Sequence, residues 1–260
     1  MGIALVTGGT SGIGATFARQ LAARGDDIVL VARNKDRLEE MAHELRGMGR
    51  EVEVLPADLA NRKDVDKVVA RLSATDKPVD ILVNNAGFGM HSRMSDEDQT
   101  DQDYAMEVMV RSVRVLAAAA ARSMRLRGHG RIINVSSTAG FITMSSGYSS
   151  IKAWVTNFSE GLSNELHGSG VTVTALCPGW VHTEFHSRAG ISKGGIPSWM
   201  WLDADPLVKS ALKDADRGKV ISIPSVRYRV LIWFARHLPR SAVRSISRAI
   251  SSGRSSTVTE

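Results

Sequence analysis

The sequence has a single cysteine, Cys177, among 260 residues, so no disulfide can form within the chain. Only Met1 and Gly2 precede the first run of β-branched residues, so we expect no signal peptide. No uncharged apolar run approaches the length needed to cross a bilayer. These absences predict a protein of a reducing compartment, and we expect it in the cytoplasm.

Acidic residues are almost missing from the end of the chain. Residues 224–260 contain seven arginines and one acid, Glu260, whereas the first 223 residues carry 26 bases and 26 acids. The formal net charge of +6 therefore belongs to this tail. A nucleic-acid-binding body carries a basic face of its own, so we expect no nucleic-acid partner.

The sequence also lacks an internal repeat, a low-complexity linker and a boundary between two domains. Short apolar runs alternate with segments of helical spacing. The apolar runs are residues 3–9, 27–33, 51–57, 79–87, 130–137, 171–179 and 219–225, and the main helical segments are 13–25, 35–49, 62–74, 103–127 and 148–168. This alternation predicts an α/β fold over residues 1–225: a single doubly wound Rossmann domain, with a seven-stranded parallel sheet and helices on both faces. The ligand is then expected beyond the carboxyl ends of the strands.

A glycine-rich turn, TGGTSGIG at residues 7–14, ends the first predicted strand and opens the first predicted helix. Gly8 permits a tight turn, Gly12 lets a pyrophosphate approach the backbone, and Gly14 lets helix and strand pack closely. The amides at the helix N-terminus then face the phosphates. A plain connecting turn is the alternative, but the strand–turn–helix context favours dinucleotide binding. The other residues expected to bind there are Thr10, Ser11 and Ile13.

The end of the second strand has no carboxylate, the group that binds the ribose 2′-hydroxyl of NAD. Arg33 stands there, 19 residues after Gly14, and the next acid is Asp36. A guanidinium pairs with a 2′-phosphate through two hydrogen bonds, which favours NADP(H) over NAD(H). The alternative for Arg33 is a solvated residue at a helix start. Asp58, followed by Leu59, is expected at the adenine edge, or only as a helix N-cap.

Five ordered motifs resemble those of the short-chain dehydrogenase/reductase family. They are TGGTSGIG, NNAG (84–87), INVSS (133–137), YSSIK (148–152) and CPGWVHTEF (177–185), and the resemblance covers about residues 3–225. It implies catalytic roles for Ser137, Tyr148 and Lys152. It further implies that the cofactor is held by Asn85, Ala86, Gly87, Tyr148, Lys152, Pro178, Gly179, Val181 and Thr183. A looser resemblance is to the 3-oxoacyl and 17β-hydroxysteroid reductase branch.

Tyr148 and Lys152 lie four residues apart, which puts them on one face of a helix. An ordinary helix start with a solvated lysine is the bland interpretation. The chemical interpretation is that Lys152 stabilises the phenolate and so lowers the pKa of the phenol, while Tyr148 protonates the developing alkoxide. The resemblance further implies that Lys152 holds the nicotinamide ribose. Ser137 is expected to orient the substrate carbonyl, with Ser136 as the alternative. Ser145, Ser146 and Ser149 are interpreted as loop and helix-cap residues.

One residue departs from the family pattern. In the helix after the fourth strand, Met109 of VMVRSV (108–113) stands where the family has an asparagine. That asparagine shapes the helix so that a backbone carbonyl holds a water leading to the lysine. Met109 therefore affects the expected proton relay but not the Tyr148–Lys152 pair. Ordinary core packing is the other interpretation of Met109.

These residues favour an NADP(H)-dependent oxidoreductase that reduces an apolar ketone or a 3-oxoacyl thioester, with Tyr148 as general acid and no metal ion. A catalytically quiet NADP(H)-binding regulator is the alternative, and the presence of both Tyr148 and Lys152 disfavours it. In the resembling family, helices equivalent to 103–127 and 148–168 pair across a two-fold axis, so we expect a homodimer or homotetramer.

Two segments are expected to set substrate choice. Residues 182–205 predict a mobile apolar lid. Residues 226–260 predict a basic amphipathic helical extension, with two short helices broken at Pro239. On its second helix, Val243, Ile246 and Ile250 share one face, and Arg240, Arg244 and Arg248 share another. The extension either closes the substrate pocket or a subunit contact, or meets a membrane surface or an acidic acyl carrier. Both interpretations predict a long apolar substrate.

Overall fold

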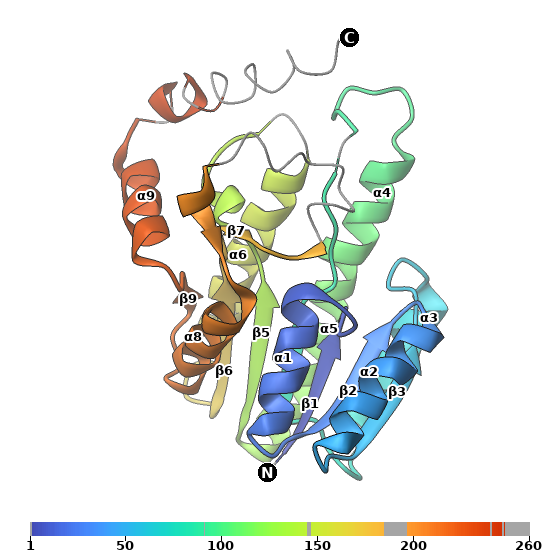
Figure 1. Ribbon diagram of the computed structural model, residues 1–260. Coiled ribbons are helices and arrows are strands. Elements are labelled where there is room, and N and C mark those ends of the chain that lie inside the picture. The colour runs from blue at the N-terminus through green and yellow to red at the C-terminus, as the bar shows by residue number, and fades with distance from the viewer. Residues whose placement is uncertain are drawn as a thin grey trace.

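The computed structural model describes residues 2–90, 92–144, 147–184, 197–239, 241–245 and 247. Seven parallel strands form one sheet in the order β3-β2-β1-β4-β5-β6-β9 (Figure 1). They are β1 (Ile3–Thr7), β2 (Asp27–Ala32), β3 (Val52–Pro56), β4 (Ile81–Asn84), β5 (Gly130–Val135), β6 (Val171–Leu176) and β9 (Ile221–Ser222). The strand order reverses at β1 and β4, so the predicted doubly wound sheet is confirmed.

Helices cover both faces of this sheet. One face carries α1 (Gly12–Ala23), α2 (Lys35–Gly47) and α8 (Ala204–Asp216), and the other carries α3 (Arg62–Ser73), α5 (Ser112–Arg127) and α6 (Tyr148–Glu165). Successive strand residues point to opposite faces, so Leu5 packs with α3 and α5 whereas Ala4 and Val6 pack with α1 and α8. Because both faces are covered, the inner strands are mostly apolar, which is why they stand out in the sequence, whereas the edge strand β3 is partly exposed.

Short elements differ from the sequence prediction. The single helix expected over 103–127 is α4 (Thr100–Met106), a π-helical turn η1 (Glu107–Arg111) and then α5. The loop expected over 182–205 contains the 3₁₀ turn η4 (Ser198–Met200) and β8 (Trp201–Leu202), which pairs with β7 (Trp180–Val181). The elements η4, β7 and β8 have only two or three residues and η1 is one turn inside a longer helical segment, so none of them leaves a periodic pattern of its own. The remainder of that loop, 185–196, with Phe185 and Ile191, lies outside the described residues.

The C-terminal extension begins with α9 (Val226–His237), which ends just before Pro239 as the sequence predicts. Residues 241–245 and 247 are again helical, and they include Val243 and Arg244. The other predicted face residues, Arg240, Ile246, Arg248 and Ile250, lie outside the described residues. No helix in the described part of the chain is both long and apolar enough to cross a membrane.

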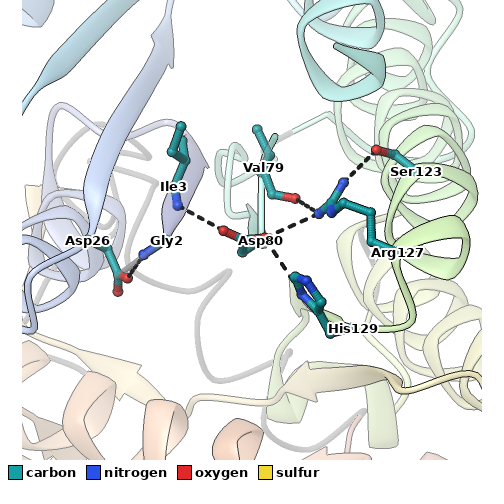
Figure 2. A network of polar contacts seen from close by, with 8 residues as sticks. All are labelled: Gly2, Ile3, Asp26, Val79, Asp80, Ser123, Arg127 and His129. Carbon is teal, nitrogen blue, oxygen red and sulfur yellow. Dashed lines mark hydrogen bonds and ion pairs between the residues drawn. The ribbon is translucent and has the colours of Figure 1, made fainter. Parts of the chain in front are cut away.

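A polar network ties the strands together at the edge opposite the expected ligand site (Figure 2). The Asp80 carboxylate accepts a hydrogen bond from the Ile3 amide at 3.2 Å and lies 3.3 Å from Nη2 of Arg127 and 3.7 Å from Nδ1 of His129. Arg127 also donates to the Val79 carbonyl at 2.6 Å. These contacts join the amino ends of β1 and β4 to the end of α5, at the edge of the sheet away from the site.

Candidate active site

A cavity of about 1020 Å³ opens at the carboxyl ends of the strands, where a doubly wound sheet binds its ligand. All residues that the sequence predicts for catalysis or cofactor binding line it, except Gly14. The predicted residues that line the cavity are Gly8, Thr10, Ser11, Gly12, Ile13, Arg33, Asp58, Leu59, Asn85, Ala86, Gly87, Ser137, Tyr148, Lys152, Pro178, Gly179, Val181 and Thr183.

The glycine turn has the geometry that the sequence suggests. A Cβ atom on Gly14 would collide with the carbonyl oxygen of Gly8, so glycine lets α1 pack against β1, behind the cavity wall. Gly12 has a φ of +53°, and a Cβ atom there would lie 3.1 Å from Cβ of Thr183. Glycine thus allows both the positive φ of the turn and its close contact with Thr183.

Asn85 secures this turn from the end of β4. Its side-chain amide donates to the carbonyl oxygens of Thr7 at 2.9 Å and Gly8 at 3.2 Å. The Thr7 hydroxyl accepts hydrogen bonds from the amides of Asn85 at 2.9 Å and Ala86 at 3.1 Å. The polar groups of Asn85 therefore hold β1 and β4 together beside the cavity.

At the far end of the cavity, Arg33, Tyr104 and Asp58 form a chain of hydrogen bonds. Nη1 of Arg33 donates to the Tyr104 hydroxyl at 2.8 Å, and that hydroxyl donates to the Asp58 carboxylate at 3.1 Å. The N-cap of α3 is Asn61, so the N-cap interpretation of Asp58 is wrong. The sequence did not identify Tyr104, because it stands 71 residues from Arg33 and 46 from Asp58.

The two serines after β5 have different surroundings. Ser136 is 1% exposed, and its hydroxyl bonds to the Lys152 carbonyl and the Thr156 hydroxyl, both at 2.7 Å. The Ser137 hydroxyl caps η2 (Thr138–Phe141) through the Ala139 amide at 3.1 Å and hydrogen-bonds to Tyr148. Ser136 thus anchors α6, whereas Ser137 is joined to the phenol.

Tyr148 and Lys152 share one face of α6. Nζ of Lys152 lies 5.5 Å from the centre of the Tyr148 ring and donates to the Val135 carbonyl at 2.9 Å. Burial raises the pKa of Tyr148, and the hydrogen bond from Ser137 only partly opposes this. Burial also lowers the pKa of Lys152 to about 8. The expected lowering of the phenol pKa is therefore not found in this structure, because removal from water outweighs the other influences on the phenol.

Met109 lies within η1 and is 1% exposed. A Cβ atom on Gly87 would lie 3.1 Å from the Met109 sulfur and 3.7 Å from Nζ of Lys152, so the methionine packs directly behind the cavity wall. The π-helical turn forms with methionine at this position, and the neighbouring Val108 lines the cavity. The core-packing interpretation of Met109 agrees with this placement.

Apolar side chains close the other end of the cavity. They are Ile142, Met144, Trp180, Pro197 and Met200. Two of them, Pro197 and Met200, belong to the loop 182–205 that the sequence predicts to cover the substrate, whereas the sequence did not single out those from the segment after β5 and from β7. Ser149, whose hydroxyl accepts from the Met144 amide at 3.2 Å, holds this segment to α6, while Ser145 and Ser146 lie outside the described residues.

Tyr228 of α9 supports this apolar end from behind. Its hydroxyl accepts a hydrogen bond from the Trp180 amide at 3.1 Å and donates to the Met200 carbonyl at 2.7 Å. A Cβ atom on Gly179 would overlap the Tyr228 ring, so the aromatic ring lies flush against the backbone there. The C-terminal extension thus helps to build the site. Among the described residues, no group of three or more His, Cys, Asp or Glu side chains is arranged to hold a metal ion.

The sequence and the fold of this chain are similar to those of known proteins. Residues 2–192 match the family model described as short chain dehydrogenase. An uncharacterized oxidoreductase of Staphylococcus aureus strain N315 is 37% identical over 183 residues, which are 70% of this chain and 78% of the relative.

Two solved structures extend the similarity to the C-terminal part of the chain. A short-chain dehydrogenase from Sphingobium yanoikuyae in complex with NADPH is 36% identical with a TM-score of 0.82, and the match covers 89% of this chain and 92% of that one. A bulky-bulky ketone specific alcohol dehydrogenase from Comamonas testosteroni is 31% identical with a TM-score of 0.78, covering 93% and 96%.

Proposed function

The chain belongs to the short-chain dehydrogenase family and is an oxidoreductase, and from this premise we propose that it reduces an apolar ketone or 3-oxoacyl thioester with NADPH. The observation that carries the proposal is that one cavity has the glycine turn at one end, Ser137, Tyr148 and Lys152 in its wall, and an apolar end under Tyr228. We infer a cytoplasmic enzyme from the lone, buried cysteine.

The residues at the nucleotide end fit NADP(H). The backbone amides at the start of α1 suit a pyrophosphate, and Gly12, which has no side chain, lines the cavity there. Arg33 is exposed at the cavity, and its guanidinium has donors to spare beyond the one bonded to Tyr104. A 2′-phosphate there would meet a cation, and the similar Sphingobium yanoikuyae enzyme is bound to NADPH. Bound in this cradle, the reduced nicotinamide supplies a hydride.

The catalytic residues then have distinct tasks. Ser137 donates a hydrogen bond to the substrate carbonyl and orients it, and Tyr148 delivers its phenolic proton to the oxygen as negative charge develops there. The pKa of the phenol is raised by burial, which keeps the proton on Tyr148 until an alkoxide forms. Lys152, once protonated, stabilises the resulting phenolate across the 5.5 Å that separate its Nζ from the ring.

The apolar end of the cavity supports a bulky or long substrate. The residues that close it (Ile142, Met144, Trp180 and Met200) present apolar surface and no charge. The similar Comamonas testosteroni enzyme is specific for bulky-bulky ketones. We also infer a homodimer or homotetramer that uses α5 and α6, because Trp154 and Phe158 of α6 form a stacked pair 4.8 Å apart that is only half-buried in the single chain.

The test is turnover of NADPH, followed at the nicotinamide absorbance band, with ketones and 3-oxoacyl thioesters of increasing chain length. We expect kcat/KM to rise by about fourfold per added methylene, the equivalent of ~0.8 kcal/mol, until the cavity is full. A flat or falling series would contradict the apolar pocket. Tight NADPH binding without turnover of any ketone would favour a regulatory protein instead.

Tyr148→Phe tests whether Tyr148 is the general acid. It keeps the ring but removes the proton, so we expect kcat to fall by at least about 100-fold while the Kd for NADPH stays nearly unchanged. If the variant keeps most of its activity, Tyr148 is not the general acid.

A further inference from the structure

The outward face of α9 is the largest gathering of exposed apolar side chains in the described part of the chain. Of the eleven large hydrophobic residues that are exposed, six lie on α9 or directly after it. They are Val226, Val230, Leu231, Trp233, Phe234 and Leu238, with exposed fractions from 39% to 65%. Trp199, which is 54% exposed, adjoins them, because the side chain of Arg227 donates to its carbonyl. We call these seven residues the α9 face.

The exposure of the α9 face follows from the way in which the other side of α9 is attached to the protein. Tyr228 and Ile232 bury the opposite side of α9 against the body of the protein, and Tyr228 is fixed by two hydrogen bonds. The helix is therefore docked in one orientation, and that orientation turns Trp233 and Phe234 outward. Figure 1 shows α9 at the margin of the molecule, on the β9 side and away from α2 and α3.

The segment that carries the α9 face contains arginines but no acidic residue. α9 contains Arg227, Arg229 and Arg236, and no acidic residue occurs between Lys219 and Glu260. Arg229 is exposed and forms no ion pair within the described ranges, and Arg244 beyond Pro239 is also exposed. An isolated apolar patch fits many partners, but an apolar ridge flanked only by arginines fits a surface that is apolar below and anionic above.

A second copy of this chain fits the face less well. A two-fold contact would bring the arginines of both helices into one interface, and neither helix offers a carboxylate to pair with them. Like charges brought together and removed from water oppose such a contact. The negative surface of a membrane pairs with the same cations, and its hydrocarbon takes up the tryptophan and phenylalanine.

We propose that the α9 face binds the surface of membranes that contain anionic lipids, with the side chains of Trp233 and Phe234 in the interfacial region. The face adjoins the apolar end of the cavity: Met200 lines the cavity directly after Trp199, and Arg236 lies 5.7 Å over the ring of Phe141 at the end of η2. A substrate dissolved in the membrane reaches the cavity from this side. This route rests on the proposed function, but membrane binding itself does not.

Co-sedimentation of the full-length protein with sucrose-loaded vesicles tests the proposal. Vesicles of phosphatidylcholine with phosphatidylglycerol are compared with phosphatidylcholine alone, with and without added salt. We expect binding to the anionic vesicles that weakens as salt is added. Arg229→Ala should lower the partition coefficient about fivefold, the usual effect of one basic residue near such a surface. The triple variant Val230→Ser, Trp233→Ser, Phe234→Ser should lose binding to both kinds of vesicle.

Two control variants each remove an exposed side chain, one apolar and one basic, from another part of the surface. Met48→Ser takes an exposed apolar side chain from the end of α2, and Lys63→Ala takes an exposed cation from α3; neither should change the partition coefficient. Turnover of a short, soluble ketone should be the same in the triple variant as in the unmodified protein, which shows that the variant is folded. This rate, measured without vesicles, also reports on the proposed function separately from the membrane.

Two outcomes overturn the proposal. The first is equal sedimentation of the triple variant and the unmodified protein, which would mean that the α9 face does not carry the binding. The second is a fall in mass by light scattering when the triple substitution is made, which would identify the face as a contact between copies of the chain.

Discussion

The choice between NADPH and NADH is expected to depend on Arg33, which follows β2 and lines the cavity. The position of Arg33 after the second strand favours a 2′-phosphate, because a guanidinium stands where NAD enzymes have a carboxylate. The sequence could not reveal that the guanidinium is held by the Tyr104 hydroxyl, since that contact crosses 71 residues. Likewise, the order of Tyr148 and Lys152 indicated a shared helix face, but the raised pKa of the phenol depends on burial by distant segments.

The first residue-scale prediction concerns the cofactor. The unmodified protein should bind NADPH more tightly than NADH by ~1.5–3 kcal/mol, the contribution of one good charge-assisted pair. Arg33→Asp should abolish or reverse this preference. Lys35→Asp, at an exposed cation that does not line the cavity, is the matched control and should leave it unchanged. Dissociation constants from fluorescence titration decide; equal values for the two cofactors in the unmodified protein would contradict the role of Arg33.

Lys152 gives a prediction about stability. Its pKa is about 8 in the folded protein, against about 10.4 for an exposed lysine. Between these pH values the unfolded chain holds more protons, so this residue makes stability rise with pH and lowers it below pH ~8. Lys152→Met should therefore raise the free energy of unfolding at pH 7 by about 1–2 kcal/mol, less than the full shift because the Val135 carbonyl loses its donor.

Urea unfolding at several pH values checks this expectation. The advantage of Lys152→Met over the unmodified protein should fall as the pH rises from ~8 to ~10.5 and should reverse there, because the neutral amine still donates to the Val135 carbonyl. Cys177, whose pKa burial raises to about 12, lowers stability in both proteins as the pH rises above ~8.5, and loss of the Lys152 charge raises that pKa further in the variant. A variant that is less stable at pH 7 would show that the buried lysine is not a cost to folding.

At the scale of elements, length separates what was predictable from what was not. Strands of four to six residues covered on both faces, and helices of more than ten, leave patterns that identified the sheet and its main helices. The strands β7 and β8 have two residues each, and η1 is one turn within a longer helix. Their existence depends on contacts with Tyr228 and on packing around Met109, which no local pattern records. The split of the extension from the catalytic domain remains a prediction.

The contacts of α9 predict that the extension is needed for catalysis. Tyr228→Phe keeps the ring against Gly179 but removes the hydroxyl that holds Trp180 and Met200. Because small displacements of positioning groups are costly, we expect kcat/KM for an apolar ketone to fall at least about tenfold. The Kd for NADPH should change less than about twofold, since the glycine turn proposed to bind the phosphates lies at the other end of the cavity. An unchanged KM and kcat would show that the hydroxyl only stabilises the fold.

For the whole molecule, the inferred assembly makes a prediction of its own. The protein should behave as a dimer or tetramer in light scattering at micromolar concentration. Trp154→Arg, which puts a charge into the half-buried aromatic pair on α6, should shift it towards a monomer. Met48→Arg on the far side of the sheet is the control and should not. A monomeric unmodified protein would remove the support for an interface at α5 and α6.

β9 and α9 come late in the sequence, and this determines when the substrate pocket can form during synthesis on the ribosome. β1 to β6 lie within the first 176 residues, so the nucleotide-binding half can assemble while synthesis continues. β9 and α9 come from residues 221–237, and only then can Tyr228 fasten Trp180 and Met200. A ribosome stalled before residue 221 should therefore display a nascent chain that already retains NADPH but has no finished pocket for the ketone. Vectorial synthesis would thus separate cofactor loading from the acquisition of substrate specificity in time.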